Sequence, residues 1–485
     1  MEEYKFDREA YEKRMQWFQE ARFGMFLHWG LYSIPARGEW VRSQEQMPEE
    51  TYMQYFREFD PVDYDPRAWA RAAKRAGMKY MVLTAKHHDG FCLFDSQYTD
   101  FKSTNTKCGR DLVGEFVEAV RAEGLKVGLY YSLLDWHHED YPHCSDPIHP
   151  MRENPAYSDE GRDFDRYLTY MHNQVRELCT NYGKLDILWF DFSYNELRGE
   201  AWKATGLVQM VRSLQPDVII DNRLEVSGEG FGSLAEGHPT PYHGDFVSPE
   251  QIIPPQGMQD VNGNDLVWEA CFTMNNNWGY HATDHFYKPA SMLIRKLVEC
   301  VSKGGNMLLN VGPDARGNFP PEATERLEEI GKWMDKNGRS IYGCGRATVE
   351  NTDQGHCGAI TENTEQGGCE TLSENEEQNG NGATGKGTDQ KISRIPMDKP
   401  DYGRVTAGDH RLYYHVFENT VGAVPLIGVK REEVEAIRYL ATGAEIPVVS
   451  DWVYSNYPDI VFANLGGDPV LPDPVDTVIE VILHQ

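Results

Sequence analysis

The alternation of short apolar runs with amphipathic helical stretches most constrains the fold of this 485-residue chain. Runs this short, without polar alternation, are typical of strands buried on both faces of a parallel sheet. The expected strands are 23–29, 78–84, 126–132, 184–192, 218–220, 266–269 and 306–311, and the expected helices are 7–20, 66–76, 111–123, 162–180, 201–214, 289–303 and 321–337. So many strand–helix units favour a (β/α)8-type, TIM-like barrel over an open doubly wound sheet. Because seven strands stand out rather than eight, the pattern is also compatible with an irregular or incomplete barrel.

The sequence pattern changes after residue 343. Residues 350–391 are rich in Asn, Glu, Gly and Thr and nearly lack large apolar side chains, which predicts a low-complexity flexible insertion without its own core. Strand-like runs follow at 411–417, 436–440 and 477–483 and favour a small antiparallel β-sandwich. We therefore expect a catalytic barrel over 1–343 and a C-terminal sandwich over 344–485.

Bulk composition excludes several classes of partner. With 47 basic and 76 acidic residues the net charge is −29, which argues against nucleic acid or an anionic membrane as a partner. Nine scattered cysteines without a CxxC motif indicate reduced thiols rather than a disulfide framework. The N-terminus lacks the apolar core of a signal peptide, so we expect a cytoplasmic protein, although a trimmed secreted chain would look the same.

Polar and aromatic side chains gather where the expected strands end. They are His28, Trp29, His87, His88, Asp135, Trp136, His137, His138, Trp189, Asp191, Asp221, Asn222, Arg223, Trp268 and Glu269, with Trp40, Tyr131 and Trp278 close by. In a parallel barrel these ends meet on one face, where active sites are built. Aromatic rings beside carboxylates, His and Arg suit a sugar, whose C–H face stacks on rings while its hydroxyls take charge-assisted hydrogen bonds.

A metal site is the first alternative, because five of these histidines are able to bind metal. Adjacent pairs such as His87-His88 and His137-His138 project in different directions on an extended chain, and no HxH or HExxH spacing occurs. The pattern therefore favours a sugar site without a metal.

Glycoside hydrolysis usually needs two carboxyl groups, one as nucleophile or base and one as acid. Asp191 is the candidate nucleophile, because it is short and ends a rigid strand beside Trp189. Glu250 and Glu269 are the candidate partners, and each also has a structural explanation. Glu250 follows Ser248 and fits the first turn of a helix, and Glu269 fits a residue bonded to a neighbouring Arg or His. Asp191 itself could cap a helix or pair with a buried Arg.

At these positions the chain resembles glycoside hydrolase family 29, the retaining α-L-fucosidases. The resemblance is carried, in order, by Phe23–Ser33, Gly38–Trp40, Thr84–Phe91, Trp189–Asp191, Arg223, Asp245–Glu250, Trp268–Glu269, Trp278–Tyr280 and Lys303–Pro313. One such segment would be weak, but the ordered set over residues 15–345 is specific. The resemblance implies an irregular (β/α) barrel followed by a β-sandwich.

The resemblance also implies a mechanism and a substrate. Asp191 would be the nucleophile that forms a covalent fucosyl-enzyme, without a metal or an organic cofactor. Glu250 fits the family's acid/base pattern and is preferred over Glu269. The residues implied to bind fucose are His28, Glu39, Trp40, His87, His88, Tyr131, Trp189, Arg223 and Trp278. The expected reaction is exo-release of terminal L-fucose from a fucosylated oligosaccharide or glycoconjugate.

Two other functions stay open at this point: a fucose-binding barrel without activity, and a barrel glycosidase for a related sugar. The chain departs from the family pattern at Phe192-Ser193, where members often have Gly. Neither the fucosyl linkage that is cleaved nor the formation of a homo-oligomer follows from the sequence.

Overall fold

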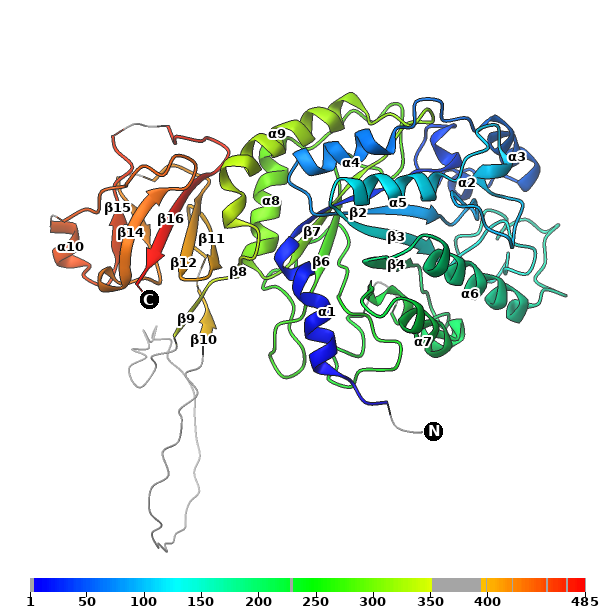
Figure 1. Ribbon diagram of the computed structural model, residues 1–485, viewed down its shortest axis with the longest axis horizontal. Helices are drawn as coiled ribbons and strands as arrows, with labels where there is room; N and C mark the ends of the chain where they lie inside the picture. Colours follow the sequence, from blue (N-terminus) through cyan, green and yellow to red (C-terminus); the bar gives the residue numbers. More distant parts are fainter. Residues whose placement is uncertain are drawn as a thin grey trace, which may run out of the picture.

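The computed structural model describes residues 4–226, 230–350, 394–397, 399–420, 422–450, 452–467 and 470–484. A larger α/β part, blue to green in Figure 1, is followed by a smaller β part, orange to red. The predicted insertion at 350–391 lies outside the described residues except for Glu350. Within the described ranges, no helix has the length and apolar character needed to span a bilayer.

Parallel strands form the sheet of the larger part, in the order β5-β4-β3-β2-β1-β7-β6. They are β1 (Phe23–Leu27), β2 (Tyr80–Lys86), β3 (Lys126–Ser132), β4 (Ile187–Asp191), β5 (Ile219–Ile220), β6 (Glu269–Thr273) and β7 (Asn306–Val311). Nearly every residue of these strands is buried, as expected for a sheet covered on both faces. The predicted parallel barrel sheet is confirmed.

Helices cover the outside of this sheet (Figure 1). The helices of the larger part are α1 (Arg8–Ala21), α2 (Val41–Gln44), α3 (Glu49–Glu58), α4 (Pro66–Arg75), α5 (Leu112–Ala122), α6 (Phe164–Asn181), α7 (Ala204–Leu214), α8 (Ala290–Ser302) and α9 (Pro321–Asn337). Asp65, Asp111 and Asp163 begin α4, α5 and α6, because each carboxylate accepts backbone N–H bonds of the first turn.

An irregular segment closes the barrel between β5 and β6. Phe246 makes a parallel bridge to Asp221 after β5, and Glu250 makes one to Cys271 of β6. The amide of Asp245 donates to the carbonyl of Ile220 at 2.6 Å, and the amide of Gln251 donates to the carbonyl of Cys271 at 2.9 Å. The sequence analysis expected no strand here, but residues 245–251 occupy the place of the eighth strand. They bring Glu250 to the same edge as the end of β4.

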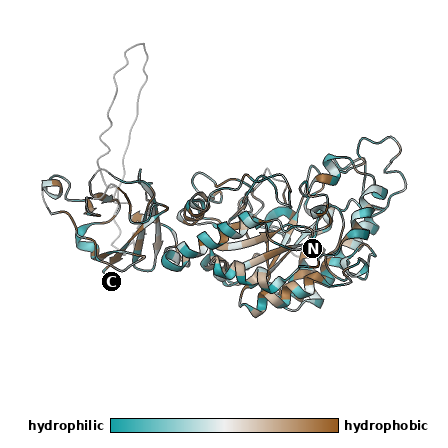
Figure 2. Ribbon diagram, turned by 90° about the horizontal axis from the view of Figure 1, so that it is seen from above, coloured by the Kyte–Doolittle hydropathy of each residue, from teal (hydrophilic) through white to brown (hydrophobic). Residues whose placement is uncertain are grey.

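Helix α1 fills the N-terminal end of the barrel. Tyr11, Met15 and Phe18 belong to the same buried apolar cluster as Tyr80 and Phe246 inside the barrel. Gly24 makes room for the Tyr80 ring, since a Cβ at Gly24 would lie 2.2 Å from it. Figure 2 shows the apolar strands enclosed by more polar helices. With this end closed by α1, the C-terminal strand ends are the face left for a site.

The C-terminal part is an antiparallel β structure. Its five-stranded sheet has the order β14-β16-β12-β11-β8, and two further pairs are β9–β10 and β13–β15. The elements are β8 (Gly345–Arg346), β9 (Thr348–Glu350), β10 (Arg394–Pro396), β11 (Gly403–Gly408), β12 (Arg411–Val416), β13 (Val424–Leu426), β14 (Val434–Tyr439), α10 (Trp452–Asn456), β15 (Val461–Ala463) and β16 (Thr477–Leu483). The three predicted strand-like runs correspond to β12, β14 and β16.

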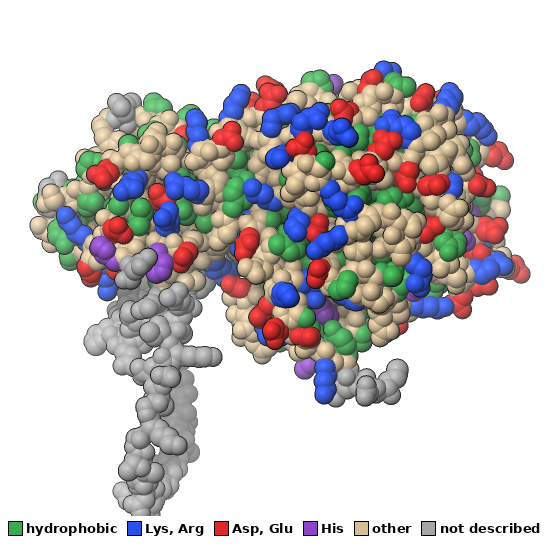
Figure 3. Space-filling model, viewed as in Figure 1, with side chains coloured by type: hydrophobic (Ala, Val, Ile, Leu, Met, Phe, Trp, Pro, Cys, Tyr) green, Lys and Arg blue, Asp and Glu red, His purple; other side chains and the backbone are tan. Residues whose placement is uncertain are grey.

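Acidic and basic side chains are intermingled over the face drawn in Figure 3, with apolar side chains between them.

Candidate active site

Asp191 ends β4 at the open face of the barrel. Its Oδ2 accepts a hydrogen bond of 2.7 Å from the Tyr130 hydroxyl, and its Oδ1 lies 3.2 Å from Nη1 of Arg223. Its side chain keeps 14% exposure, so the carboxylate is largely buried but open to a ligand. Asp191 therefore lies at a strand end as predicted. It also forms an ion pair with Arg223, which the sequence analysis gave as a purely structural explanation for this carboxylate.

The backbone around Asp191 is held on both sides. The carbonyl of Asp191 accepts from the amide of Leu133 at 2.9 Å, and the amide of Phe190 donates to Oδ1 of Asp221 at 2.8 Å. Oδ2 of Asp221 accepts from the amide of Arg223. This bond caps the short 3-10 turn Asn222–Leu224, which carries the arginine. One buried carboxylate thus fixes both the strand that presents Asp191 and the turn that presents its partner.

Arg223 connects the two candidate catalytic carboxylates. Its Nη2 lies 3.1 Å from Oε2 of Glu250, and its Nε donates to Oγ of Ser248 at 3.0 Å. The guanidinium also lies over the Trp189 ring, 5.1 Å from the ring centroid. The Glu250 side chain is 44% exposed, in contrast to the buried Asp191. A buried and an exposed carboxylate on one guanidinium are arranged as a nucleophile and a solvent-reachable proton carrier would be.

Burial raises the pKa of the Asp191 carboxyl to about 6, and the negative charge of Glu250 acts in the same direction. The Arg223 guanidinium and the Tyr130 hydrogen bond oppose this shift. The pKa of Arg223 is raised overall, because its acidic neighbours outweigh its burial. Asp191 is consequently ionised at neutral pH, as a nucleophile must be.

Three predicted histidines lie together at the ends of β1 and β2. His28 is held by the side chain of Asn310 at 2.7 Å from its Nδ1, and burial lowers its pKa to about 3. His88 has its Nδ1 2.7 Å from the hydroxyl of Ser132 and its Nε2 3.8 Å from Oδ2 of Asp191. The ring of His87 stacks on Tyr130 at 5.7 Å. All three are neutral at pH 7, since burial lowers the pKa of each.

Glu39, Trp40 and Trp278 also reach this cluster. Oε2 of Glu39 accepts from the amide of Gly279 at 2.7 Å, and burial raises the pKa of Glu39 to about 6. The Trp40 ring lies 5.0 Å from His88, and Trp278 lies 5.1 Å from His28. Aromatic faces and hydrogen-bonding groups thus converge at one edge of the sheet. Among the described residues, no three His, Cys, Asp or Glu side chains group as a metal site.

The structure does not bring Tyr131 to this cluster. Tyr131 is buried, and its hydroxyl donates to Gln174 of α6, on the helix side of the sheet. Tyr130, which the sequence analysis missed, faces the interior and holds Asp191. Neighbouring residues of a strand point to opposite faces, and the run is apolar and aromatic on both, so its pattern could not tell them apart.

Glu269 does not lie beside Asp191 in the way predicted. It is the first residue of β6 rather than the end of a strand, and it pairs with Asn306 at the start of β7. Its side chain is fully buried and accepts a hydrogen bond from Tyr80, the first residue of β2. Burial raises the pKa of Glu269 to about 8. The structure places this carboxyl near the closed end of the barrel, away from the strand ends that carry Asp191.

Phe192, where the chain departs from the family pattern, has a φ of +80°. For a bulky side chain this left-handed conformation is unfavourable by about 1–3 kcal/mol and persists only where the surroundings impose it. The Phe192 ring packs against His88 at 5.2 Å and Trp40 at 5.7 Å. A ring that glycine would lack therefore lies directly beside Asp191.

Comparisons with known proteins agree with this geometry. The family profile described as "Alpha-L-fucosidase" matches residues 1–339. An α-L-fucosidase of Dictyostelium discoideum is 31% identical over 69% of this chain and 73% of its own length. The structure of α-L-fucosidase isoenzyme 1 from Paenibacillus thiaminolyticus is 50% identical and superimposes with a TM-score of 0.84, covering 98% of this chain and 100% of that one.

A third similar structure bears on the chemistry. It is an α-L-fucosidase from Bacteroides thetaiotaomicron, trapped as a covalent intermediate with 2-fluoro-fucosyl fluoride. It is 28% identical, has a TM-score of 0.75 and covers 100% of this chain and 98% of that one.

Proposed function

This chain belongs to the α-L-fucosidase family, and we propose that Asp191 and Glu250 are the catalytic pair with which it hydrolyses α-L-fucosides. The activity is that of a retaining fucosidase acting on fucosylated glycans. The observation that carries the assignment is the single guanidinium of Arg223, which contacts both carboxylates at 3.2 and 3.1 Å.

In the first step, Oδ of Asp191 attacks the anomeric carbon of a terminal fucose while Glu250 gives a proton to the departing glycosidic oxygen. This step forms a fucosyl ester on Asp191 and releases the rest of the glycan as an alcohol. In the second step, Glu250 takes a proton from water, and the water oxygen replaces Asp191 at the anomeric carbon. The product is L-fucose with its original anomeric configuration.

The remaining residues hold the sugar in this scheme. His28, Glu39, His87, His88 and Arg223 supply polar groups to its hydroxyls and ring oxygen. Trp40, Trp189, Trp278 and Tyr130 supply ring faces or orient the polar groups. An inactive fucose-binding barrel would not need one arginine, Arg223, to contact both a buried aspartate and an exposed glutamate.

Trapping the intermediate tests the assignment of the nucleophile. We expect 2-fluoro-fucosyl fluoride to add one 2-fluoro-fucosyl group to the protein and to label the peptide that contains Asp191, because the fluorine slows the second step more than the first. Mass spectrometry of the intact protein and of its peptides measures this. A label on another carboxylate, or turnover of an aryl α-L-fucoside with inversion, would contradict the proposal.

The pH dependence follows from the Asp191 carboxyl. Since this group must be ionised and its pKa is raised to about 6, kcat/KM should fall about tenfold per pH unit below pH 6. Glu250→Gln should move this acidic limb to lower pH, because it removes a negative charge that raises the Asp191 pKa. A dinitrophenyl α-L-fucoside, whose leaving group needs no acid, allows the measurement in both proteins. Glu39→Gln is the control, since the Glu39 pKa is also raised to about 6 and the limb should survive its loss.

A further inference from the structure

A buried ion pair lies behind His88, and the scheme above gives it no role. Lys86, the last residue of β2, places Nζ 3.0 Å from Oδ2 of Asp135, and the two side chains are 0% and 1% exposed. Burying two charges costs about as much free energy as their attraction returns, so such a pair is weak evidence for stability. Its position next to the site invites a functional explanation.

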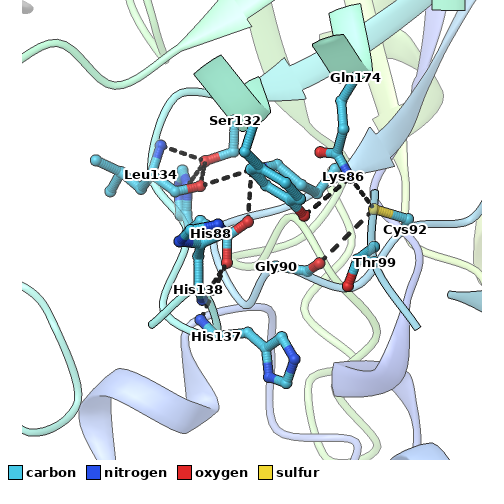
Figure 4. A network of polar contacts seen from close by, with 12 residues as sticks. Lys86, His88, Gly90, Cys92, Thr99, Ser132, Leu134, His137, His138 and Gln174 are labelled. Atoms are coloured by element: carbon cyan, nitrogen blue, oxygen red, sulfur yellow. Dashed lines mark hydrogen bonds and ion pairs between the residues drawn. The ribbon is translucent and has the colours of Figure 1, made fainter. Parts of the chain in front are cut away.

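The pair holds the turn that follows β3, and Figure 4 shows Lys86 together with Leu134, His137 and His138 of this turn. Nζ of Lys86 also donates to the carbonyl of Leu134 at 3.2 Å. Oδ1 of Asp135 accepts from the amides of His137 at 3.1 Å and His138 at 2.9 Å. The next contact leads back to the site, because the amide of Trp136 in this turn donates to the carbonyl of His88 at 2.8 Å.

The hydroxyl of Ser132 links this turn to the His88 ring (Figure 4). It accepts from the amide of Leu134 at 3.0 Å and has two further neighbours, the carbonyl of Leu134 at 3.0 Å and Nδ1 of His88 at 2.7 Å. A hydroxyl has one proton to donate. If the proton goes to the Leu134 carbonyl, His88 must donate its own proton from Nδ1, and Nε2 then carries no proton. If it goes to His88, the imidazole carries its proton on Nε2.

We infer that Lys86 is a positioning residue that sets the tautomer of His88, so that the Nε2 proton faces Asp191 and the bound sugar. The ammonium of Lys86 already donates to one of the two lone pairs of the Leu134 carbonyl, so this oxygen is a weaker acceptor for the Ser132 proton and Nδ1 of His88 competes better for it. The inference rests on the proposed place of His88 in the fucose pocket.

The tautomer matters because of what faces the ring. Nε2 of His88 lies 3.8 Å from Oδ2 of Asp191, too far for a direct hydrogen bond but close enough for electrostatic interaction. An Nε2–H group is attracted to this carboxylate and can donate to a sugar oxygen, whereas a bare Nε2 lone pair would repel the carboxylate. His88 is neutral, since burial lowers its pKa and the Lys86 ammonium acts in the same direction, so the position of its single proton decides what it offers.

A combined variant tests the inference without leaving a bare buried charge. Lys86→Met with Asp135→Asn removes both charges, and the asparagine Oδ1 can still accept from the two backbone amides of the turn. We expect kcat/KM to fall about 10- to 100-fold, the range known for groups that orient histidine ligands of metals by hydrogen bonding. Ser132→Ala should cause a similar fall. Adding it to the combined variant should cause little more, because both act through one proton. Losses that multiply would overturn the inference.

Nitrogen NMR of 15N-histidine-labelled protein reads the tautomer without any turnover. His88→Gln identifies the signals of His88, which should show a protonated Nε2 in the wild-type protein and lose that state in the combined variant. A wild-type His88 protonated on Nδ1 would overturn the inference. Lack of fucosidase activity with the expected tautomer present would instead contradict the proposed function. Asp476→Asn, which alters the buried pair with His415 in the C-terminal part, is the control: it should lower the melting temperature but change neither kcat/KM nor the His88 signals.

Discussion

Asp191→Gly should lower kcat/KM for an aryl α-L-fucoside by about 10^4- to 10^6-fold, the scale seen when a covalent nucleophile is removed. Without this carboxylate, no group at the end of β4 can attack the anomeric carbon, and Arg223 loses its buried partner. The side chain of Asp191 is largely buried, so glycine leaves a space beside Tyr130 that a small anion can occupy.

Azide should therefore restore part of the activity of Asp191→Gly. Because azide enters from the side that Asp191 occupied, the product should be the β-fucosyl azide, which proton NMR distinguishes from the α-anomer. Asp186→Asn is a matched control just before the start of β4, where the carboxylate bonds to Lys126 and the amide of Val127. It should keep kcat/KM within a few-fold of wild type. An Asp191→Gly variant with more than about a tenth of the wild-type rate would exclude covalent catalysis by this residue.

The parallel strands could be predicted because burial on both faces leaves a strong apolar signal. Positions such as Asp191 and Arg223 follow from that prediction, since they come directly after such runs. The face on which a residue lies could not be predicted in the same way. In β3, Tyr130 and Tyr131 are both aromatic and both buried, and only the pairing of β3 with β4 decides which one meets Asp191.

The segment that takes the place of the eighth strand could not be predicted for a different reason. Residues 245–251 make scattered bridges instead of a continuous ladder, so they need no apolar run. The same segment explains the error at Glu269. The apolar residues before it pair with residue 247 of the closing segment, and the ladder with β7 begins only at Glu269. Both effects come from pairing partners far away in the sequence, and local patterns do not contain that information.

Glu250→Ala should produce a loss that depends on the leaving group. For a fucosylated oligosaccharide, whose departing alcohol needs a proton, kcat/KM should fall about 10^2- to 10^4-fold. For a dinitrophenyl fucoside the first step needs no acid, so kcat/KM should change little while slow hydrolysis of the intermediate lowers kcat. The 44% exposure of the Glu250 side chain fits a group that must exchange protons with solvent in each cycle.

Azide distinguishes this role from a purely structural one. It attacks the fucosyl-Asp191 intermediate without a general base, so it should raise kcat of Glu250→Ala on the dinitrophenyl substrate and yield the α-fucosyl azide. The α-fucosyl azide from Glu250→Ala and the β-fucosyl azide from Asp191→Gly would therefore distinguish the acid/base role from the nucleophile role. No structural defect of the loop would give this pair of results.

Glu269→Gln is the decisive comparison, because Glu269 is the other glutamate that fits the sequence. Its carboxyl is buried near the closed end of the barrel, and burial raises its pKa to about 8, so glutamine resembles the protonated acid present at neutral pH. The variant should keep wild-type kcat/KM for good and poor leaving groups alike. As the pH rises from about 4.5 to about 8, the free energy of unfolding of the wild type should decrease, because folded Glu269 retains a proton that the unfolded chain releases. The variant has no such proton at residue 269, so its free energy of unfolding should decrease less over this range. A loss specific to poor leaving groups in Glu269→Gln, with Glu250→Ala unaffected, would reverse the assignment of the acid.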